Sequence, residues 1–159
     1  MSVWSPVTRN TVLHSARTSI AAVISTLLAR SLLKLAEFYW APVSTVVILL
    51  SSINPIKLAW QRFAGTALGA VMGALIASYL SPTWWVFGVG IFISGIISAL
   101  LRIGAAYRFA GITLTIVLLV PHTHPGWIVG FHRFVEVSLG IVVALLVTLV
   151  WRLDPPDAS

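Results

Sequence analysis

The sequence has 159 residues, of which 58% are apolar and 9% charged, and its mean hydropathy is +1.00. This composition excludes an ordinary water-soluble domain and is typical of a chain that lies in a bilayer. Ten Lys and Arg residues against four acids give a net charge of +6, but the cations stand singly between apolar runs, which argues against nucleic-acid binding. Cysteine is absent and acids are scarce, so we expect no enzyme, no metal site and no cofactor.

Long apolar runs separated by short breaks predict six transmembrane helices in an all-α membrane protein. A bilayer core of about 30 Å needs about 20 apolar residues per helix, and Pro or Gly stands in most of the breaks. The predicted helices span residues 10–36, 38–53, 56–80, 83–102, 105–120 and 126–153. An N-terminal cytoplasmic segment, 1–9, and a C-terminal cytoplasmic tail, 154–159, flank this six-helix module, 10–153.

Aromatic and cationic residues indicate how the helices are oriented. Amphipathic rings favour the membrane interface, and eight of them fall near predicted helix ends: Trp40, Trp60, Trp84, Trp85, Trp127, Trp151, Tyr79 and Tyr107. Placing the N-terminus in the cytoplasm puts most Lys and Arg residues on that side, as the positive-inside rule requires. We therefore predict a multi-pass protein of the plasma or inner membrane with both termini in the cytoplasm.

The second half of the chain faintly repeats the first. The matching segments are Trp60-Gln61-Arg62-Phe63 with Phe131-His132-Arg133-Phe134, Leu68-Gly69 with Leu139-Gly140, Pro42 with Gly111, and Ser44 with Thr113. A unit of three helices is odd in number, so a tandem copy crosses the membrane in the opposite sense. The pattern predicts a 3+3 inverted repeat, the arrangement of many transporters.

Small residues on the third predicted helix form a stripe. Gly65, Gly69 and Gly73 recur every fourth residue, which lets another helix backbone come close, within the chain or across a dimer. Gly140 is the repeat-related glycine of helix six. Arg62 and Thr66 border the stripe, so the arginine either faces protein and a water-filled path or snorkels to the headgroups.

Helix six carries the other intramembrane charges. Arg133 lies three residues and His132 four residues from Glu136, so both basic groups can reach this carboxylate. An acid at this depth is costly when unpaired. The group is either a structural ion pair or part of a permeation path, in which Arg133 attracts an anion and Glu136 controls its passage.

The second and fifth predicted helices are the shortest. Short segments at matching places in two halves point to a transport site, because a freed helix end offers partial charge to a substrate. Ser44, Thr45, Thr113 and Thr115 would then supply hydroxyl groups. The alternative is ordinary helix initiation at Pro42.

Four segments, in this order and spacing, resemble the membrane module of the fusaric acid resistance family, the aromatic acid exporter group, with a more distant similarity to plant aluminium-activated malate channels. They are Phe38-Tyr39-Trp40-Ala41-Pro42-Val43-Ser44, Gln61 to Ala70, Ala106-Tyr107-Arg108 and His132 to Val137. The resemblance covers residues 15–152, and its motif positions are Arg62, Gly65, Thr66, Gly69, Arg108, Arg133 and Glu136.

The resemblance implies a six-helix plasma-membrane module that handles small organic anions, commonly aromatic carboxylates, and assembles as at least a homodimer. Larger efflux members carry a second membrane module and soluble regions, whereas this chain ends in a short tail. Homodimerisation through the glycine stripe, or a partner subunit, would supply what is missing.

Two functions are therefore compatible with the sequence. The first is a transporter or exporter, channel-like or otherwise, whose arginines near each mouth draw small organic anions into the path. The second is a non-transporting membrane subunit whose glycine face binds a larger partner protein. Neither predicts a catalytic residue. The substrate-path candidates are Arg62, Thr66, Arg108, Arg133, Glu136, Ser44 and Thr113, and the helix-packing candidates are Gly65, Gly69, Gly73 and Gly140.

Overall fold

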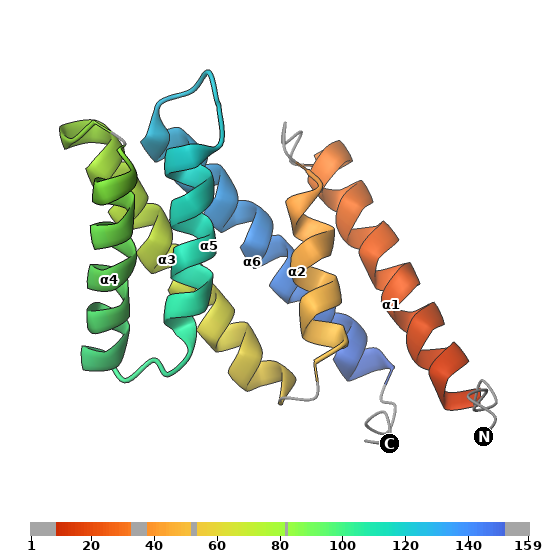
Figure 1. The fold of residues 1–159 in the computed structure, drawn as a ribbon. Helices are drawn as coiled ribbons and strands as arrows, with labels where there is room; N and C mark the ends of the chain where they lie inside the picture. The colour runs from red at the N-terminus through yellow and green to blue at the C-terminus, as the bar shows by residue number, and fades with distance from the viewer. Residues whose placement is uncertain (1–8, 33–37, 52–53, 82, 152–159) are drawn as a thin grey trace, which may run out of the picture. The chain divides into compact units, whose positions relative to one another are not determined.

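The computed structural model describes residues 9–32, 38–51, 54–81 and 83–151, and these ranges contain helices joined by turns, with no strand. They include six α-helices, which Figure 1 labels. Their bounds are α1 Arg9–Leu27, α2 Trp40–Leu49, α3 Pro55–Tyr79, α4 Trp84–Leu100, α5 Ala106–Leu119 and α6 Gly126–Val150, with the π-helical segment η1 Leu28–Leu32 continuing α1. The prediction of an all-α chain with six helices is confirmed. The predicted tail, 154–159, and residues 1–8 of the predicted N-terminal segment lie outside the described residues.

One predicted boundary was wrong. The second helix was expected to reach residue 53, but α2 ends at Leu49, and the amide of Leu50 closes its last turn on the carbonyl of Val46 at 3.0 Å. Pro55 begins α3, and a proline disfavours helical geometry in the residue before it. Residues 52 and 53 of the predicted second helix lie outside the described residues.

Length and apolarity distinguish the helices. Within the described residues, Val12–Ser31 and Gly126–Val150 are long and apolar enough to cross a membrane. Three further helices, Trp40–Leu49, Trp84–Leu100 and Ala106–Leu119, are apolar but shorter. The 25-residue α3 has the length of a span and carries polar side chains among its small residues.

The described residues form two compact units. One unit, residues 56–138, contains α3, α4, α5 and the first part of α6 (Figure 1). Ile76, Leu114 and Leu118 make a buried core cluster in this unit, with Met72 and Phe87 packed against it. Helices α4 and α5 are joined by a short turn and lie side by side.

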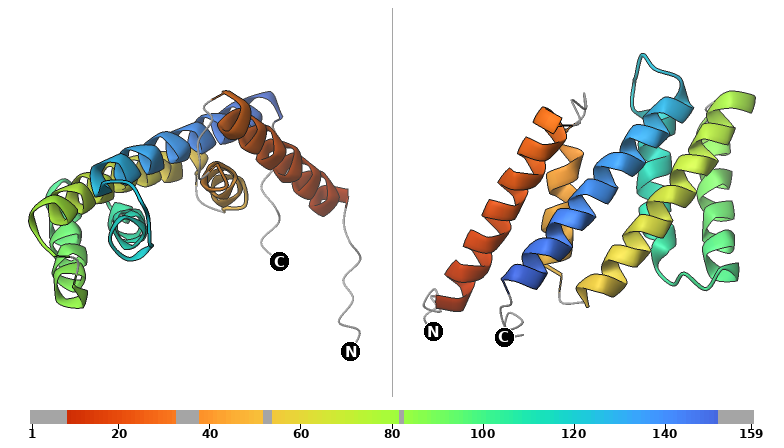
Figure 2. Two further views of the ribbon diagram at one scale, coloured as in Figure 1. Left: turned by 90° about the horizontal axis from the view of Figure 1, so that it is seen from above. Right: turned by 180° about the vertical axis from the view of Figure 1, so that it is seen from behind.

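The other unit, residues 1–55 and 139–159, contains α1, α2 and the second part of α6 (Figure 2). Arg17 is buried here, and its Nη1 donates a hydrogen bond of 3.2 Å to the carbonyl of Trp151, just past the end of α6. The last carbonyl groups of a helix have no hydrogen-bond partner within the helix and lie at the negative end of its dipole. A guanidinium there donates the missing hydrogen bond and places a positive charge at that end. Residues from the two ends of the sequence are thereby held together.

The turn between α4 and α5 contains a residue in an unusual conformation. Arg102 has a positive φ of 54°. The amide of Ile103 donates to the carbonyl of Ser98 at 3.0 Å, and that of Arg102 to Ala99 at 3.1 Å, the two bonds of a Schellman helix ending. Glycine normally occupies the left-handed position, because a side chain there costs roughly 1–2 kcal/mol.

Arg102→Gly is therefore expected to stabilise the protein by about 1 kcal/mol, after allowing for the extra backbone freedom of glycine in the unfolded chain. Thermal unfolding of the purified protein in detergent measures the effect. Leu100→Gly is the matched control, because Leu100 is exposed and helical, and glycine there should destabilise by about 1 kcal/mol. Equal destabilisation by both changes would contradict the assignment of strain to Arg102.

Candidate functional site

Charged side chains are buried between helices of the unit formed by residues 56–138. Arg62 on α3 is 8% exposed, Arg133 on α6 is 3% exposed, and Glu136 on α6 is fully buried. Glu136 is the single carboxylate of the described residues. The alternative that Arg62 snorkels to the headgroups is wrong, because its side chain is enclosed by protein.

Arg133 and Glu136 are paired on α6. Nη1 of Arg133 lies 3.5 Å from Oε2 of Glu136, the spacing that an i, i+3 pair on one helix allows. A buried pair of this kind costs solvation and is destabilising to break, because the remaining charge stays buried. The contact predicted from the sequence between these residues is present, and its role in a path stays a prediction.

Arg62 is held by an aromatic ring and faces a second cation. Its guanidinium carbon lies 5.1 Å from the ring centre of Phe109 on α5, within the range of a cation–π contact. Arg62 and Arg133 are also close enough to interact as like charges. The sequence placed these arginines near opposite mouths, whereas the structure brings them into one cluster, the Arg62–Arg133–Glu136 cluster.

Two phenylalanines lie beside this cluster. Phe63 follows Arg62 and Phe134 follows Arg133, and their ring centres are 5.0 Å apart. This is the usual separation for an aromatic pair. The sequence alignment pairs Phe63 with Phe134, so two residues that it pairs are in direct contact.

The glycine stripe of α3 lies against α5. A Cβ atom at Gly65 would be 2.2 Å from the carbonyl oxygen of Ala106, and one at Gly69 would be 2.5 Å from that of Ala110. A Cβ at Gly73 would be 2.9 Å from Val117. The sequence left open whether this stripe packs within the chain or across a dimer, and α5 of the same chain covers it. Homodimerisation stays a prediction.

A second contact, in the other unit, repeats this geometry. A Cβ atom at Gly140 of α6 would be 2.3 Å from the carbonyl oxygen of Ala41 and 2.6 Å from Cβ of Ser44 on α2. The corresponding neighbours of Gly69 are the carbonyl of Ala110 and Cβ of Thr113. Gly69 and Gly140, which the sequence alignment pairs, thus each lie against an alanine carbonyl and the Cβ of a residue with a hydroxyl group.

The candidate hydroxyl groups are buried at these two crossings. Ser44 is fully buried and its hydroxyl donates to the carbonyl of Trp40 at 3.3 Å, while Thr66 and Thr113 are 2% and 3% exposed. Thr45, another of the candidate hydroxyl groups, has its Oγ1 3.1 Å from the carbonyl oxygen of Gly140.

Other sequence candidates lie away from the cluster. Arg108 is exposed in the first turn of α5, with its guanidinium 6.0 Å from the ring of Tyr107. The ring nitrogens of His122 contact the carbonyl oxygens of Val117 at 2.9 Å and His124 at 2.7 Å. No group of three or more His, Asp or Glu residues within the described ranges is arranged to hold a metal ion.

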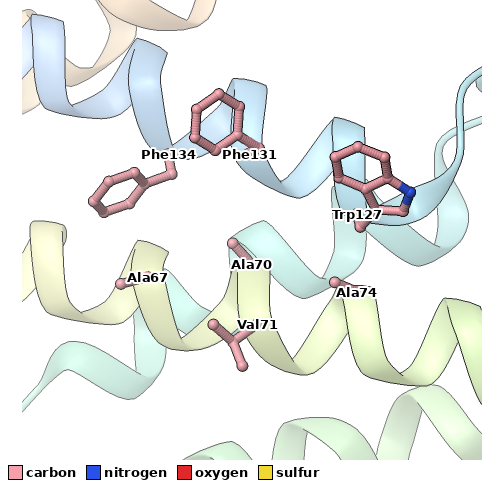
Figure 3. A pocket seen from close by; sticks show the side chains of 7 residues that line it. All are labelled: Ala67, Ala70, Val71, Ala74, Trp127, Phe131 and Phe134. Atoms are coloured by element: carbon pink, nitrogen blue, oxygen red, sulfur yellow. The ribbon is translucent and has the colours of Figure 1, made fainter.

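An apolar groove of about 370 Å³ lies between α3 and the first part of α6, and we call it the α3–α6 groove. Figure 3 shows the small side chains of α3 on one side and the aromatic rings of α6 on the other. The lining residues are Ala67, Ala70, Val71, Ala74, Trp127, Phe131 and Phe134. None of them is charged, so the groove and the charged cluster are separate features of the same unit.

Comparison with known proteins identifies the family. Residues 20–147, most of the chain, match the fusaric acid resistance protein-like family. The chain belongs to that family. An uncharacterized protein of Corynebacterium glutamicum is 26% identical over 156 residues, which cover 95% of this chain and 39% of that protein. No solved structure matches the chain.

Membership in the fusaric acid resistance protein-like family agrees with the resemblance in the four sequence segments. It makes the chain a membrane protein of a transport family, in agreement with its apolar helices. The chain spans about two fifths of the length of its Corynebacterium relative.

Gly69→Ala and Gly140→Ala are each expected to lower the free energy of unfolding by about 1–3 kcal/mol, because the new methyl group meets a backbone carbonyl that cannot move aside. Thermal or denaturant unfolding in detergent gives the values. Gly88→Ala on α4 is the control: no atom lies within 4 Å of its Cβ position, so alanine should stabilise by up to about 1 kcal/mol. Tolerance of alanine at both Gly69 and Gly140 would refute the close approach.

Glu136→Gln is expected to destabilise by about 3–5 kcal/mol, because it removes the carboxylate that pairs with the buried guanidinium of Arg133. The double change Arg133→Gln with Glu136→Gln should cost less than the sum of the two single changes. A double-mutant cycle on unfolding free energies measures this coupling. Strict additivity would show that Arg133 and Glu136 do not interact.

Proposed function

We propose that the protein is an integral membrane transporter or exporter of small organic anions, such as aromatic carboxylates. The observation that supports this function is the Arg62–Arg133–Glu136 cluster, in which two guanidinium groups and one carboxylate are buried together. Family membership supports the transport class. The choice of an anion follows from the two buried guanidinium groups, whose planar donors suit a carboxylate.

Two buried arginines favour an anionic ligand. Charged residues within membrane segments are costly and mark substrate or ion pathways. Arg62 and Arg133 interact as like charges, and Arg133 pairs with Glu136. Bidentate arginine contacts suit a planar carboxylate. Glu136 then competes with the substrate for Arg133 and controls its passage.

The other path candidates take positions consistent with this mechanism. Arg108 is exposed at the start of α5, where a cation raises the local concentration of anions. Ser44, Thr66 and Thr113 are buried beside the close helix crossings and offer hydroxyl groups along the helices. We assign these side chains to the path on that basis.

We further propose that the chain is a 3+3 inverted repeat that crosses the membrane six times, with both termini in the cytoplasm. The matching neighbours of Gly69 and Gly140 support this arrangement. Contact between Phe63 and Phe134 supports it as well, because equivalent residues touch only near the axis that relates two repeats.

The assembly proposed with this function is a homo-oligomer, or a complex with a partner subunit, that does not use the glycine stripe. The second candidate function, a non-transporting subunit that binds a larger protein, would leave the buried charges without a use beyond packing. Flux from the purified chain distinguishes the two functions. Crosslinking to a stoichiometric partner together with an inactive purified chain would favour the subunit.

Reconstitution into proteoliposomes tests the transport function. Arg62→Ala and Arg133→Ala should each reduce the flux of an aromatic carboxylate such as benzoate by about tenfold or more, because a hydrogen bond to a charged group contributes about 1.5–3 kcal/mol. Size-exclusion profiles of the purified variants show whether they are folded. Arg62→Lys, which keeps the charge, should retain part of the flux.

Lys57→Ala is the matched control, since Lys57 is an exposed cation on the same helix, α3, and lies outside the cluster. Its removal changes the net charge by the same amount as the arginine changes. Unchanged flux in folded Arg62→Ala and Arg133→Ala proteins, or equal loss in Lys57→Ala, would exclude the cluster as the anion site.

A further inference from the structure

The segment that joins α5 to α6, residues 120–125, forms an exposed loop at one end of its unit (Figure 1). His122 lies in this loop, and both nitrogens of its ring contact carbonyl oxygens. Nε2 is 2.9 Å from the carbonyl oxygen of Val117 in the last turn of α5, and Nδ1 is 2.7 Å from that of His124. Both are hydrogen-bond distances, so the ring connects the end of the helix to the far part of the loop.

The sequence explains why Val117 accepts a hydrogen bond from a side chain. In a continuing α-helix its carbonyl group would accept from the amide four residues on, which belongs to Pro121. Proline has no amide hydrogen, so this carbonyl has no backbone donor at that position. A carbonyl group at the C-terminal end of a helix also lies at the negative end of the helix dipole, where a cation is favoured. The ring of His122 takes the place of the missing donor.

The charge state of the ring decides how many of these two hydrogen bonds form. A carbonyl oxygen only accepts hydrogen bonds, and a neutral imidazole has one N–H donor and one bare nitrogen. A neutral ring therefore satisfies one carbonyl group and places a lone pair against the other oxygen. The imidazolium has two N–H donors and satisfies both. The two contacts of His122 are complete only with the imidazolium.

Few other ionisable groups lie near this loop. Residues 63–101 and 109–132, which include the end of α3, all of α4 and the start of α6, contain no Asp, Glu, Lys or Arg. Apart from His122, their titratable side chains are Tyr79, His124 and His132. Tyrosine stays neutral near pH 7, and His132 lies ten residues along the chain from His122. The changes of charge in the loop between about pH 5 and 8 therefore belong to His122 and His124.

Val117, which His122 holds, lies where three helices meet. It is 1% exposed, and a Cβ atom at Gly73 of α3 would be 2.9 Å from its side chain. A Cβ atom at Gly126, the first residue of α6, would be 2.5 Å from that of Ala77 on α3 and 3.6 Å from Cγ1 of Val117. The last turn of α5 is thus packed against α3 and the start of α6. A change in the loop therefore acts on the packing of these helices.

We propose that His122 is a pH-sensitive latch of the α5–α6 loop. As the imidazolium, it holds the carbonyl groups of Val117 and His124 and closes the loop on the last turn of α5. Loss of its proton releases one of these carbonyl groups, and the end of α5 and the start of α6 become freer to move. In the topology proposed above, the loop lies on the side of the membrane opposite the termini, where the latch responds to external pH. The latch does not depend on the transport function or its substrate.

Hydrogen–deuterium exchange of the full chain in nanodiscs tests the latch. It is measured by mass spectrometry at about pH 5.5 and about pH 8, on either side of the range in which histidine titrates. Rates are corrected for the intrinsic effect of pH, and peptides of α4 are the internal reference. The amides of Val120 and Ile128 donate to the carbonyl groups of Ile116 and Pro125 on the two sides of the loop. Peptides that cover residues 118–129 should exchange about tenfold faster at the higher pH, which is within the effect of a cation at a helix C-terminus.

Three loop variants make the test specific. His122→Gln removes both ring contacts and should exchange quickly at both pH values. His124→Gln is the matched control, because it removes a histidine from the same loop but keeps the main-chain carbonyl group, and it should retain the wild-type pH dependence. Pro121→Ala restores an amide hydrogen four residues after Val117. Its exchange should be slow at both pH values although His122 is still present.

Equal corrected rates at the two pH values in the wild-type chain would overturn the latch. The same conclusion follows if pH dependence persists in His122→Gln or disappears in His124→Gln. Unchanged pH dependence in Pro121→Ala would show that the carbonyl group of Val117 is not the partner that matters. A rise in exchange that extends equally to the peptides of α4 would assign the effect to loosening of the whole unit and exclude the loop.

Discussion

Close approach of helix backbones at glycine is the constraint on which this structure depends. At Gly65 and Gly69 the α3 backbone lies against carbonyl groups of α5 with no room for a methyl group. Only this spacing encloses Arg62 against Phe109, because a wider gap between the helices would admit lipid or water to the guanidinium. The glycines therefore act on function indirectly, by determining the environment of a charge.

The long apolar runs, and the Pro and Gly residues between them, were sufficient to predict the helices. Pro55, Gly104 and the segment from Pro121 to Pro125 mark real boundaries, and the expected bounds of α3 to α5 agree with the observed ones within a few residues. The end of α2 was missed, although the apolar run stops at Leu50 and two serines follow it. The local sequence predicts the start of a helix more clearly than its end.

The charged cluster could be predicted only in part. Spacing on a single helix was enough to pair Arg133 with Glu136. The proximity of Arg62 to Arg133 depends on the register of α3 against α6, which no local pattern encodes. The same limit applies to Phe63 and Phe134, which were aligned as repeat equivalents but not expected to touch. Arg108 resembles the other arginines in sequence, and only the fold shows that it is exposed.

The contacts that close the unit of residues 1–55 and 139–159 have a consequence for biogenesis. Arg17 and Trp151 are 134 residues apart in the chain, and Thr45 and Gly140 are 95 apart. Because synthesis proceeds from the N-terminus, the hairpin of α1 and α2 is made long before its partner helix emerges. During that interval the Arg17 guanidinium lacks its carbonyl acceptor. The contacts of Arg17 and Thr45 with this last part of the chain therefore form only after α6 has been made.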